Sequence, residues 1–449
     1  MDERESFFRN PYREGATVHM AVDKIAYGGE GLGRVGATVM FVAGAIPGDV
    51  IEARIIDVQK NFLRGYLINI LQPSPLRVPP PCPVYDRCGG CHLQTIAPES
   101  QQQVKKQILD DCLRDLRAAH PAAPLPLPMI TSPEGYGYRL RCQLKTEWDG
   151  RQRIIGFYAR RSGHLIRITS CPICAPALNN VMPAAASLLE LPAFQGREIK
   201  SLELVTNNAG DGLLITIQMK GRPPAATDLF PVFKERLPML RGLGCGAGYA
   251  GVEEQPLFET VGGDNYRISL GSFFQINRFL LGQLREQCVN LLAPTAEDIV
   301  VDLFCGTGFF TLPLARLAKR VVGVESNLAA VQDAHINATA ADCKNVKFMA
   351  RPAEQFRFDR PAGKAPSEPF TMAFIDPPRQ GCHTRLIDVL IANPLRRLLY
   401  LSCNPTTMVR DINALAAGGY KLTTLQPFDF FPQTYHLELA AVLEWTGSI

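Results

Sequence analysis

The sequence predicts an α/β protein of three parts, because the pattern of apolar residues, glycines and cysteines changes twice along its 449 residues. Residues 16–71 hold short apolar stretches separated by glycines, and a β-rich middle follows that carries cysteines. From about Gln275 a helical run is predicted to extend to Leu292, and apolar strands then alternate with helical segments, a pattern typical of a mostly parallel, doubly wound sheet. We therefore expect domains at 11–72, 73–274 and 275–449, since one core rarely extends over so long a chain.

The first part is predicted to be a small antiparallel β-barrel. Its strands are short and glycine turn signals are frequent, for example Gly28-Gly29, as in small closed barrels that often bind nucleic acids. The prolines of Pro73–Pro81 then form a stiff linker that ends the barrel.

Cysteines open the second part with the spacing Cys82-x5-Cys88-x2-Cys91, and Cys171-x2-Cys174 follows downstream. Thiolates at this spacing in a proline- and glycine-containing loop are typical of a metal site. Zinc and an iron-sulfur cluster both fit the spacing.

Charge and hairpin signals mark the rest of the second part. Between Arg139 and Arg167 lie eight basic and two acidic residues, although the whole chain has a net charge of only +4. Such a strip on neighbouring strands could follow a phosphate backbone, and the alternative is a solvated hairpin face. Hairpin turns are predicted at Asn207–Gly212 and Gly262–Asn265.

The N-terminus and the hydrophobicity pattern indicate a cytoplasmic protein. The first six residues are largely charged, unlike a secretory signal, and no apolar run approaches the about 20 residues that span a bilayer. We expect the 13 cysteines to be reduced in that compartment.

The third part contains a nucleotide-type binding motif, Asp302-Leu-Phe304-Cys-Gly306-Thr-Gly308, after a predicted strand. Glu325 ends the next strand, where its carboxylate can accept hydrogen bonds from ribose hydroxyls. The dinucleotide pattern G-x-G-x-x-G/A is not met. The motif instead resembles the first motif of Rossmann-like methyltransferases, which implies S-adenosylmethionine as cofactor.

Three further segments carry the predicted reaction centre: Ile375-Asp376-Pro-Pro-Arg379, Leu401-Ser-Cys403-Asn-Pro and His436-Leu-Glu438. A lone cysteine after a strand is more often a small core residue, but beside these motifs Cys403 is predicted to be a nucleophile. The apolar surroundings of Glu438 should raise its pKa, which suits a base. A glutamate on an edge strand, pointing into water, is the alternative.

The order SFFQIN, DLFCGTG, DPPRQG, SCNP and HLE along residues 272–438 resembles the RNA uracil-5-methyltransferase family. That resemblance implies Cys403 as nucleophile and Glu438 as base, with Phe273 and Arg379 at the uracil. It also implies that the following residues surround S-adenosylmethionine and the base: Gln275, Phe304, Gly306, Glu325 and Asp376.

The resemblance extends to the N-terminal half. The barrel resembles the TRAM domain, and longer family members carry a [4Fe-4S] cluster, which implies the ligands Cys82, Cys88, Cys91 and Cys171 and leaves Cys174 as a spare. Cys-x3-Cys-x2-Cys, the usual radical S-adenosylmethionine spacing, is absent. Barrel and cluster together favour a 23S rRNA substrate over tRNA, with no membrane and no obligate protein partner.

Two departures and two alternatives accompany this interpretation. Phe309 stands where the family commonly has asparagine, and Arg351-Pro352-Ala353 lacks a frequent polar contact. A nitrogen methyltransferase also uses Asp-Pro-Pro, but there an aromatic residue takes the place of Arg379. A nonenzymatic RNA-binding protein with the same fold is the second alternative.

Overall fold

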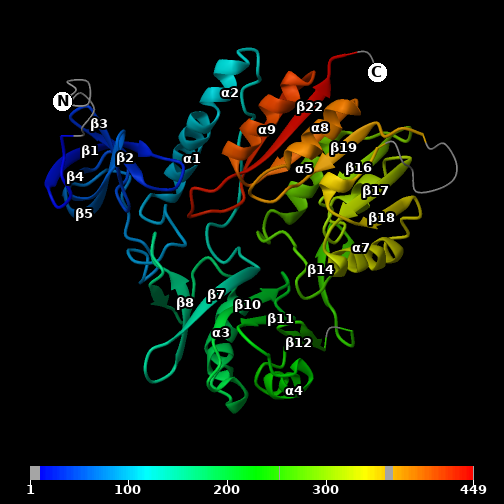
Figure 1. Ribbon diagram of the computed structural model, residues 1–449, viewed down its shortest axis with the longest axis horizontal. Coiled ribbons are helices and arrows are strands. Elements are labelled where there is room, and N and C mark those ends of the chain that lie inside the picture. The colour runs from blue at the N-terminus through cyan, green and yellow to red at the C-terminus, as the bar shows by residue number, and fades with distance from the viewer. Residues whose placement is uncertain (1–10, 252, 359–367, 448–449) are drawn as a thin grey trace, which may run out of the picture. The chain divides into compact units, whose positions relative to one another are not determined.

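The computed structural model describes residues 11–251, 253–358 and 368–447 (Figure 1). The charged N-terminal residues and the last two residues of the predicted 275–449 domain lie outside this range. The chain packs as two compact units: the first joins the residues up to Arg114 to Phe431–His436, and the second joins Asp115–Phe430 to the segment from Leu437 onward. We keep the three sequence domains as a proposal. Within the described residues, no helix is both long and apolar enough to cross a membrane.

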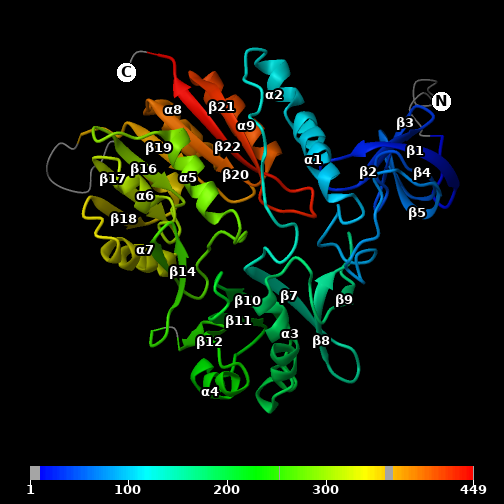
Figure 2. The same cartoon turned by 180° about the vertical axis from the view of Figure 1, so that it is seen from behind.

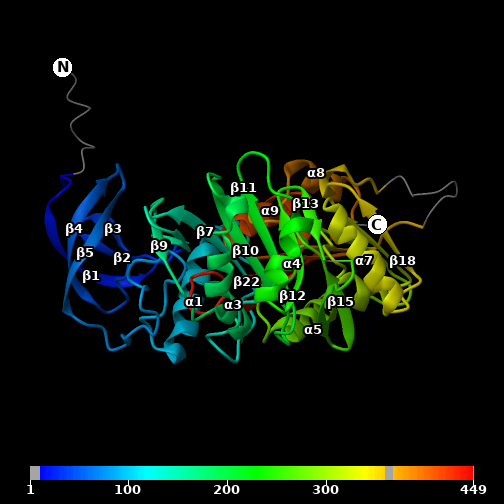
Figure 3. The same cartoon turned by 90° about the horizontal axis from the view of Figure 1, so that it is seen from below.

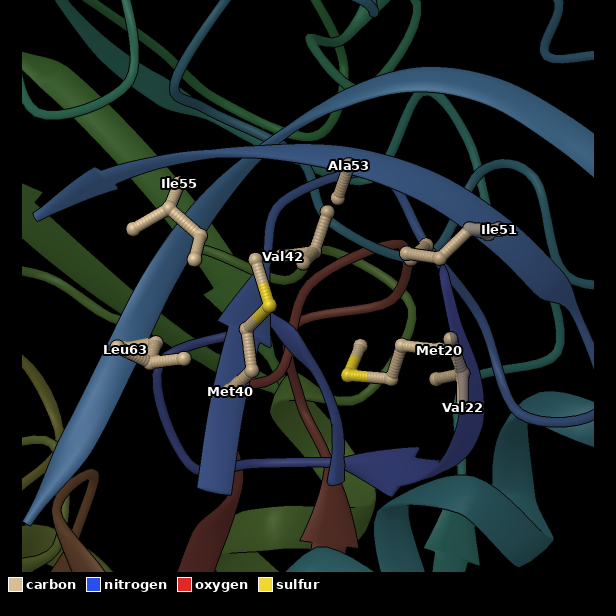
Figure 4. Packing of buried hydrophobic residues seen from close by; sticks show 9 residues of the cluster. Met20, Val22, Met40, Val42, Ile51, Ala53, Ile55 and Leu63 are labelled. Atoms are coloured by element: carbon tan, nitrogen blue, oxygen red, sulfur yellow. The ribbon is translucent and has the colours of Figure 1, made fainter. Parts of the chain in front are cut away.

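A closed five-stranded barrel, of order β1-β2-β3-β5-β4, forms most of the first unit. Its strands are β1 (Thr17–Ile25), β2 (Gly31–Val35), β3 (Thr38–Val42), β4 (Val50–Val58) and β5 (Phe62–Gln72). Alternate residues point inward, as Figure 4 shows for Met20, Met40, Ile51 and Leu63, and they are almost fully buried. The prediction of a small closed barrel is confirmed, but the barrel is not antiparallel throughout, because β3 and β5 pair parallel. Strand β5 ends where the proline linker begins.

The first unit continues through the cysteine loop into helix α1 (Pro98–Cys112). The helix begins with Pro98 at its first position, where no intrahelical N–H is needed. Val104 and Ile108 pack into a second core with Ile25, Ile46 and Leu93. Tyr435 of the distant hexapeptide Phe431–His436 also packs against this core.

A seven-stranded sheet of order β13-β12-β11-β10-β7-β8-β9 is one of the two large sheets of the second unit. Helices α3 (Pro176–Leu188) and α4 (Ala226–Arg236) pack against it (Figure 3), and the short helix α2 (Arg114–Ala119) precedes it. The strands are β7 (Arg141–Trp148), β8 (Arg153–Tyr158), β9 (Leu165–Arg167), β10 (Ile199–Thr206), β11 (Leu213–Met219), β12 (Leu240–Cys245) and β13 (Gly248–Ala250).

Both predicted hairpins are present. Strands β10 and β11 pair antiparallel across Asn207–Gly212, and β14 (Leu257–Val261) pairs with β15 (Asp264–Ile268). The second turn needs left-handed backbone at Gly262 and Gly263, with φ of 58° and 85°. Glycine adopts these angles without steric cost.

The C-terminal half forms a second large sheet, of order β18-β17-β16-β19-β20-β22-β21-β6, in which only β6 comes from the earlier part of the described chain. Its strands are β16 (Ile299–Leu303), β17 (Arg320–Glu325), β18 (Val346–Ala350), β19 (Met372–Ile375), β20 (Arg397–Ser402), β21 (Tyr420–Asp429), β22 (Glu438–Trp445) and β6 (Ile130–Thr131). Pairing is parallel from β18 to β20 and antiparallel at β22, so the predicted mostly parallel sheet is confirmed.

Helices α5 to α9 accompany this sheet (Figure 2). They are α5 (Leu281–Leu292), α6 (Thr311–Ala315), α7 (Leu328–Ala340), α8 (Thr384–Ala392) and α9 (Pro405–Ala417). The predicted helical start near Gln275 is wrong: Leu140 N donates to Ile276 O at 2.9 Å and Arg278 N donates to Tyr138 O at 3.0 Å. The backbone there pairs with the chain entering β7, and the helix begins only after this pairing ends.

Candidate active site

One edge of the C-terminal sheet gathers the predicted site. Strand register pairs Leu303 with Ile375, and Ile375 with Tyr400, so the carboxyl ends of β16, β19 and β20 meet there. Strand β22 runs the opposite way and therefore starts at this edge, where Ser402 pairs with Leu439. Asp376, Cys403 and Glu438 each lie one residue from these pairs, at the edge where doubly wound sheets bind ligands.

Cys403 is partly exposed at the end of β20. Burial raises the pKa of its thiol to about 12, and the nearby charge of Glu438 adds to that rise. Arg379 opposes it through its positive charge and a hydrogen bond with the thiol. Arg379 is therefore the side chain that favours the thiolate form of Cys403.

Glu438 is only 4% exposed, so the alternative of an edge glutamate in water is wrong. Strand β22 lies between β20 and β21 and not at the edge of the sheet. Burial and the charge of Asp376 raise the pKa of Glu438 well above its ordinary value, as its apolar sequence surroundings predict. A carboxylate with such a pKa is a stronger base when it loses its proton.

Asp376 and Asp302 extend this cluster of carboxyl groups. Gln275 Nε2 donates to Asp376 Oδ2 at 3.2 Å, and burial together with Asp302 raises the pKa of Asp376 to about 8. Burial likewise raises the pKa of Asp302 to about 7. Thr311 donates to Asp302 Oδ2, whereas Asp302 Oδ1 is buried without a hydrogen-bond partner in the described chain.

Of the predicted cofactor residues, Phe304 and Gly306 lie in the turn after β16 and Glu325 ends β17, whereas Asp376 follows β19 and Gln275 precedes α5. Gly306 N donates to Glu325 Oε2 at 3.2 Å, and Asn327 N donates to Glu325 Oε1 at 2.7 Å. Phe304 has φ of +65°, a left-handed conformation that is uncommon for residues other than glycine. The Glu325 carboxylate and the orphan oxygen of Asp302 suit the hydroxyl and amino groups of S-adenosylmethionine.

Phe309, which stands where the family commonly has asparagine, is a buried core residue and not a candidate for contact with the cofactor. Its side chain is 5% exposed and packs in an aromatic cluster with Tyr266, Phe274 and Phe310. Its carbonyl accepts a hydrogen bond from Tyr266 at 3.1 Å. The phenylalanine is thus a core residue that supports the glycine turn.

The two residues predicted at the uracil are exposed, as a substrate contact requires. Phe273 has 55% of its surface exposed, and the neighbouring Ser272 carbonyl accepts from Arg141 at 3.3 Å. The carbonyl of Arg379 accepts from Asn404 Nδ2 at 2.9 Å. This bond ties the Asp376–Arg379 loop to the residue that follows Cys403.

Sequence reasoning missed the support beneath these loops. Asp411 is 3% exposed, and its Oδ2 accepts from Cys382 N at 2.8 Å and from Tyr400 OH at 2.7 Å. Arg410 donates to the carbonyl of Gln380 at 2.9 Å. An acidic residue within a helix gives no local signal for such contacts.

The cysteines do not form a recognisable metal centre: no three His, Cys, Asp or Glu side chains among residues 11–251, 253–358 and 368–447 are arranged to hold a metal ion. Cys88 and Cys91 are nevertheless nearly buried, and Gly90 N donates to Cys88 Sγ at 3.4 Å. Cys174 is 1% exposed, and its thiol hydrogen-bonds with the thiols of both Cys142 and Cys171, so it lies directly beside the expected ligand Cys171.

The basic strip follows β7, β8 and β9. Arg141 pairs with Glu203 at 2.7 Å, and Arg153 donates to the carbonyl of Arg197 at 3.1 Å, so both have structural partners. Arg151 and Arg167 are exposed.

Comparison with known proteins agrees with this geometry. The tRNA (Uracil-5-)-methyltransferase family profile matches residues 260–446, and the TRAM domain profile matches residues 11–68. The 23S rRNA (uracil(1939)-C(5))-methyltransferase of Vibrio parahaemolyticus is 33% identical over 95% of this chain and 96% of its own. An uncharacterized RNA methyltransferase of Thermosynechococcus vestitus is 32% identical over 96% and 99%.

The fold has a full-length counterpart among solved structures. The Pyrococcus abyssi tRNA (uracil-54, C5)-methyltransferase, in complex with S-adenosyl-L-homocysteine, matches with a TM-score of 0.69 at 22% identity, over 94% of this chain and 100% of that one. At this identity the likeness establishes the shared fold. The sequence relatives establish more: this chain is an enzyme of the RNA uracil-5-methyltransferase family.

Proposed function

We propose that this enzyme forms 5-methyluridine in 23S rRNA through a covalent bond between Cys403 and the uracil. The observation that carries the proposal is the register of β20 and β22, which puts Cys403 and Glu438 at neighbouring positions on one sheet edge beside Arg379. A nitrogen methyltransferase needs neither a thiol nor a buried base there.

The chemistry requires both groups because uracil carbon 5 is a poor nucleophile. The Cys403 thiolate bonds to carbon 6 and the ring becomes an enolate, which Arg379 can stabilise by charge. S-adenosylmethionine, when bound, supplies the methyl group that carbon 5 takes. Glu438 then removes the proton from carbon 5, and the electron pair expels Cys403 as a thiolate.

The remaining site residues are proposed to orient the two reactants. Glu325 would accept hydrogen bonds from the ribose, while Phe304 and Gly306 shape the turn beside it. Gln275 and Asp376 would hold the uracil edge, and exposed Phe273 can stack on a base that has left its helix.

A 23S rRNA substrate is supported by the TRAM match and by the near full-length similarity to the Vibrio parahaemolyticus enzyme. tRNA is the second candidate, because the structural counterpart over 94% of the chain is a tRNA enzyme. Either RNA would place the enzyme in the cytoplasm.

The test is methyl transfer from labelled S-adenosylmethionine to undermodified total RNA, followed by sizing of the RNA and nucleoside mass analysis. We expect 5-methyluridine in large ribosomal RNA, and none with Cys403→Ala. Label in tRNA would overturn the substrate and keep the chemistry. Label on a nitrogen, or full activity of Cys403→Ala, would overturn the mechanism.

We also propose that Cys82, Cys88, Cys91 and Cys171 bind a [4Fe-4S] cluster. The cysteine spacing and the N–H donated to Cys88 Sγ support ligation, since such bonds are common around cluster sulfurs. No catalytic step depends on it. Iron and labile sulfide analysis of anaerobically purified protein should find both elements, and zinc without sulfide would contradict the cluster.

A further inference from the structure

The loop that precedes Glu438 is held by side chains more than three hundred residues away in the sequence. Strands β21 and β22 form a hairpin whose last pair is Phe428 with Glu438, and the hexapeptide Phe431–His436 lies in its loop. The hexapeptide belongs to the same compact unit as α1 and the cysteine loop. Its contacts in that unit therefore decide the shape of the loop.

Lys105 of α1 joins the two ends of this hexapeptide. Its Nζ donates to Phe431 O at 2.9 Å and to His436 O at 3.0 Å. The residue is 0% exposed, whereas its neighbour Lys106 is exposed. Burying an ammonium group costs free energy unless hydrogen bonds compensate for the lost water. The buried Lys105 ammonium therefore depends on its hydrogen bonds to these two carbonyls.

The middle of the hexapeptide is fixed as well. Gln433 is 2% exposed and has φ of +66°, a left-handed conformation that is unfavourable for a residue with a side chain. Its carbonyl accepts from His92 N at 2.9 Å and Leu93 N at 3.0 Å, directly after Cys91. Gln101 Nε2 donates to Gln433 Oε1 at 3.0 Å. Surrounding contacts thus impose a conformation that the segment would not choose alone.

We infer that Lys105 is a positioning residue for the proton-removal step: by binding the carbonyls at both ends of Phe431–His436, it fixes the mouth of the β21–β22 hairpin and so the carboxylate of Glu438. Glu438 is the second residue after His436, so little chain separates the bound carbonyl from the base. The inference rests on the proposed function, because it assigns Lys105 to the step that Glu438 carries out.

The test follows the covalent adduct as well as turnover, using Lys105→Met, which removes the charge and keeps a long side chain. Misplacing a reacting group by about 1 Å can cost about 100-fold in rate. We expect Lys105→Met to form the Cys403–RNA adduct with S-adenosylmethionine as the wild type does, but to resolve it about 10- to 100-fold more slowly. The adduct should then accumulate on denaturing gels. Lys106→Met is the matched control and should behave as the wild type.

A second variant covers the case in which Lys105→Met does not fold. Thr434 Oγ1 donates to Phe431 O at 2.8 Å and accepts from His436 N at 3.2 Å, so Thr434→Val loosens the same loop with little change of shape. It should also accumulate adduct. Normal turnover, or slow turnover without adduct, in the folded variants would overturn the inference. Absence of 5-methyluridine with the wild type would instead overturn the proposed function.

Discussion

Glu438 offers the most direct test at the scale of single residues. Glu438→Gln keeps the shape of the side chain but cannot take a proton from carbon 5, and without that step Cys403 cannot leave. We expect methylated RNA to remain bound to the protein as a band of reduced mobility on a denaturing gel, sensitive to nuclease. Turnover should fall at least about 100-fold.

The matched control is Glu444→Gln, on the same strand, where the carboxylate pairs with Arg397 near the surface. It should turn over normally and show no such band. Release of product by Glu438→Gln at the wild-type rate would remove Glu438 from its proposed role.

Asp302 should make stability depend on pH. Its pKa is raised to about 7 in the folded protein, so folding favours its protonated form. The stability that it contributes is present at low pH and is lost as pH rises through about 7. The side chain of Asp302→Asn stays neutral at every pH. In cofactor-free protein, the Tm of this variant relative to that of the wild type should therefore rise between about pH 5 and pH 8. A constant difference in Tm across that range would contradict the raised pKa.

The sequence could predict the residues of the site but not all of their surroundings. Cys403, Glu438 and Asp376 follow strand-like segments, and the ends of parallel strands meet at one edge, so their proximity is predictable. The burial of Phe309 against Tyr266 and Phe274 is not predictable, because these contacts join residues that no local pattern connects.

At the scale of elements, helix α9 should stabilise the catalytic loops through Asp411. Asp411→Ala leaves Tyr400 OH and Cys382 N buried without their acceptor, which costs about 1–3 kcal/mol for each group. We expect a lower Tm, and a kcat that falls more than KM changes because the Asp376–Arg379 loop loses its support. Asp388→Ala, at an exposed position of α8, is the control and should stay within about 0.5 kcal/mol of the wild type. Equal effects of the two substitutions would argue against this support.

Elements with local signals are the ones that the sequence predicts well. The glycine pair at 262–263 specifies its hairpin, and apolar runs specify β16, β17, β19 and β20. Strand β6 pairs with β21 almost three hundred residues later, and residues 276–278 pair with 138–140 in place of the predicted helix. Both contacts depend on the assembled sheet, and segments of two or three residues carry no local pattern that predicts them.

At the scale of the whole molecule, RNA affinity should depend on salt through the exposed part of the basic strip. Each phosphate contact that is lost lowers the slope of log K against log salt by about 1. Arg151→Gln with Arg167→Gln should therefore weaken RNA binding and reduce the slope by about 2. Lys344→Gln, an exposed lysine after α7, is the matched control. An unchanged slope would favour the alternative of a solvated hairpin face.

The return of Phe431–His436 to the first unit has a consequence for the order in which the protein is made. The barrel and α1 leave the ribosome early, but the carbonyl of Phe431 that Lys105 binds follows 326 residues later. At about 5–20 residues per second this is a delay of tens of seconds. During that interval the hexapeptide has not yet been made, so the first unit can be completed only after Phe431–His436 has left the ribosome. A chain that ends before Phe431 would therefore lack Glu438 together with the hexapeptide that we propose positions it.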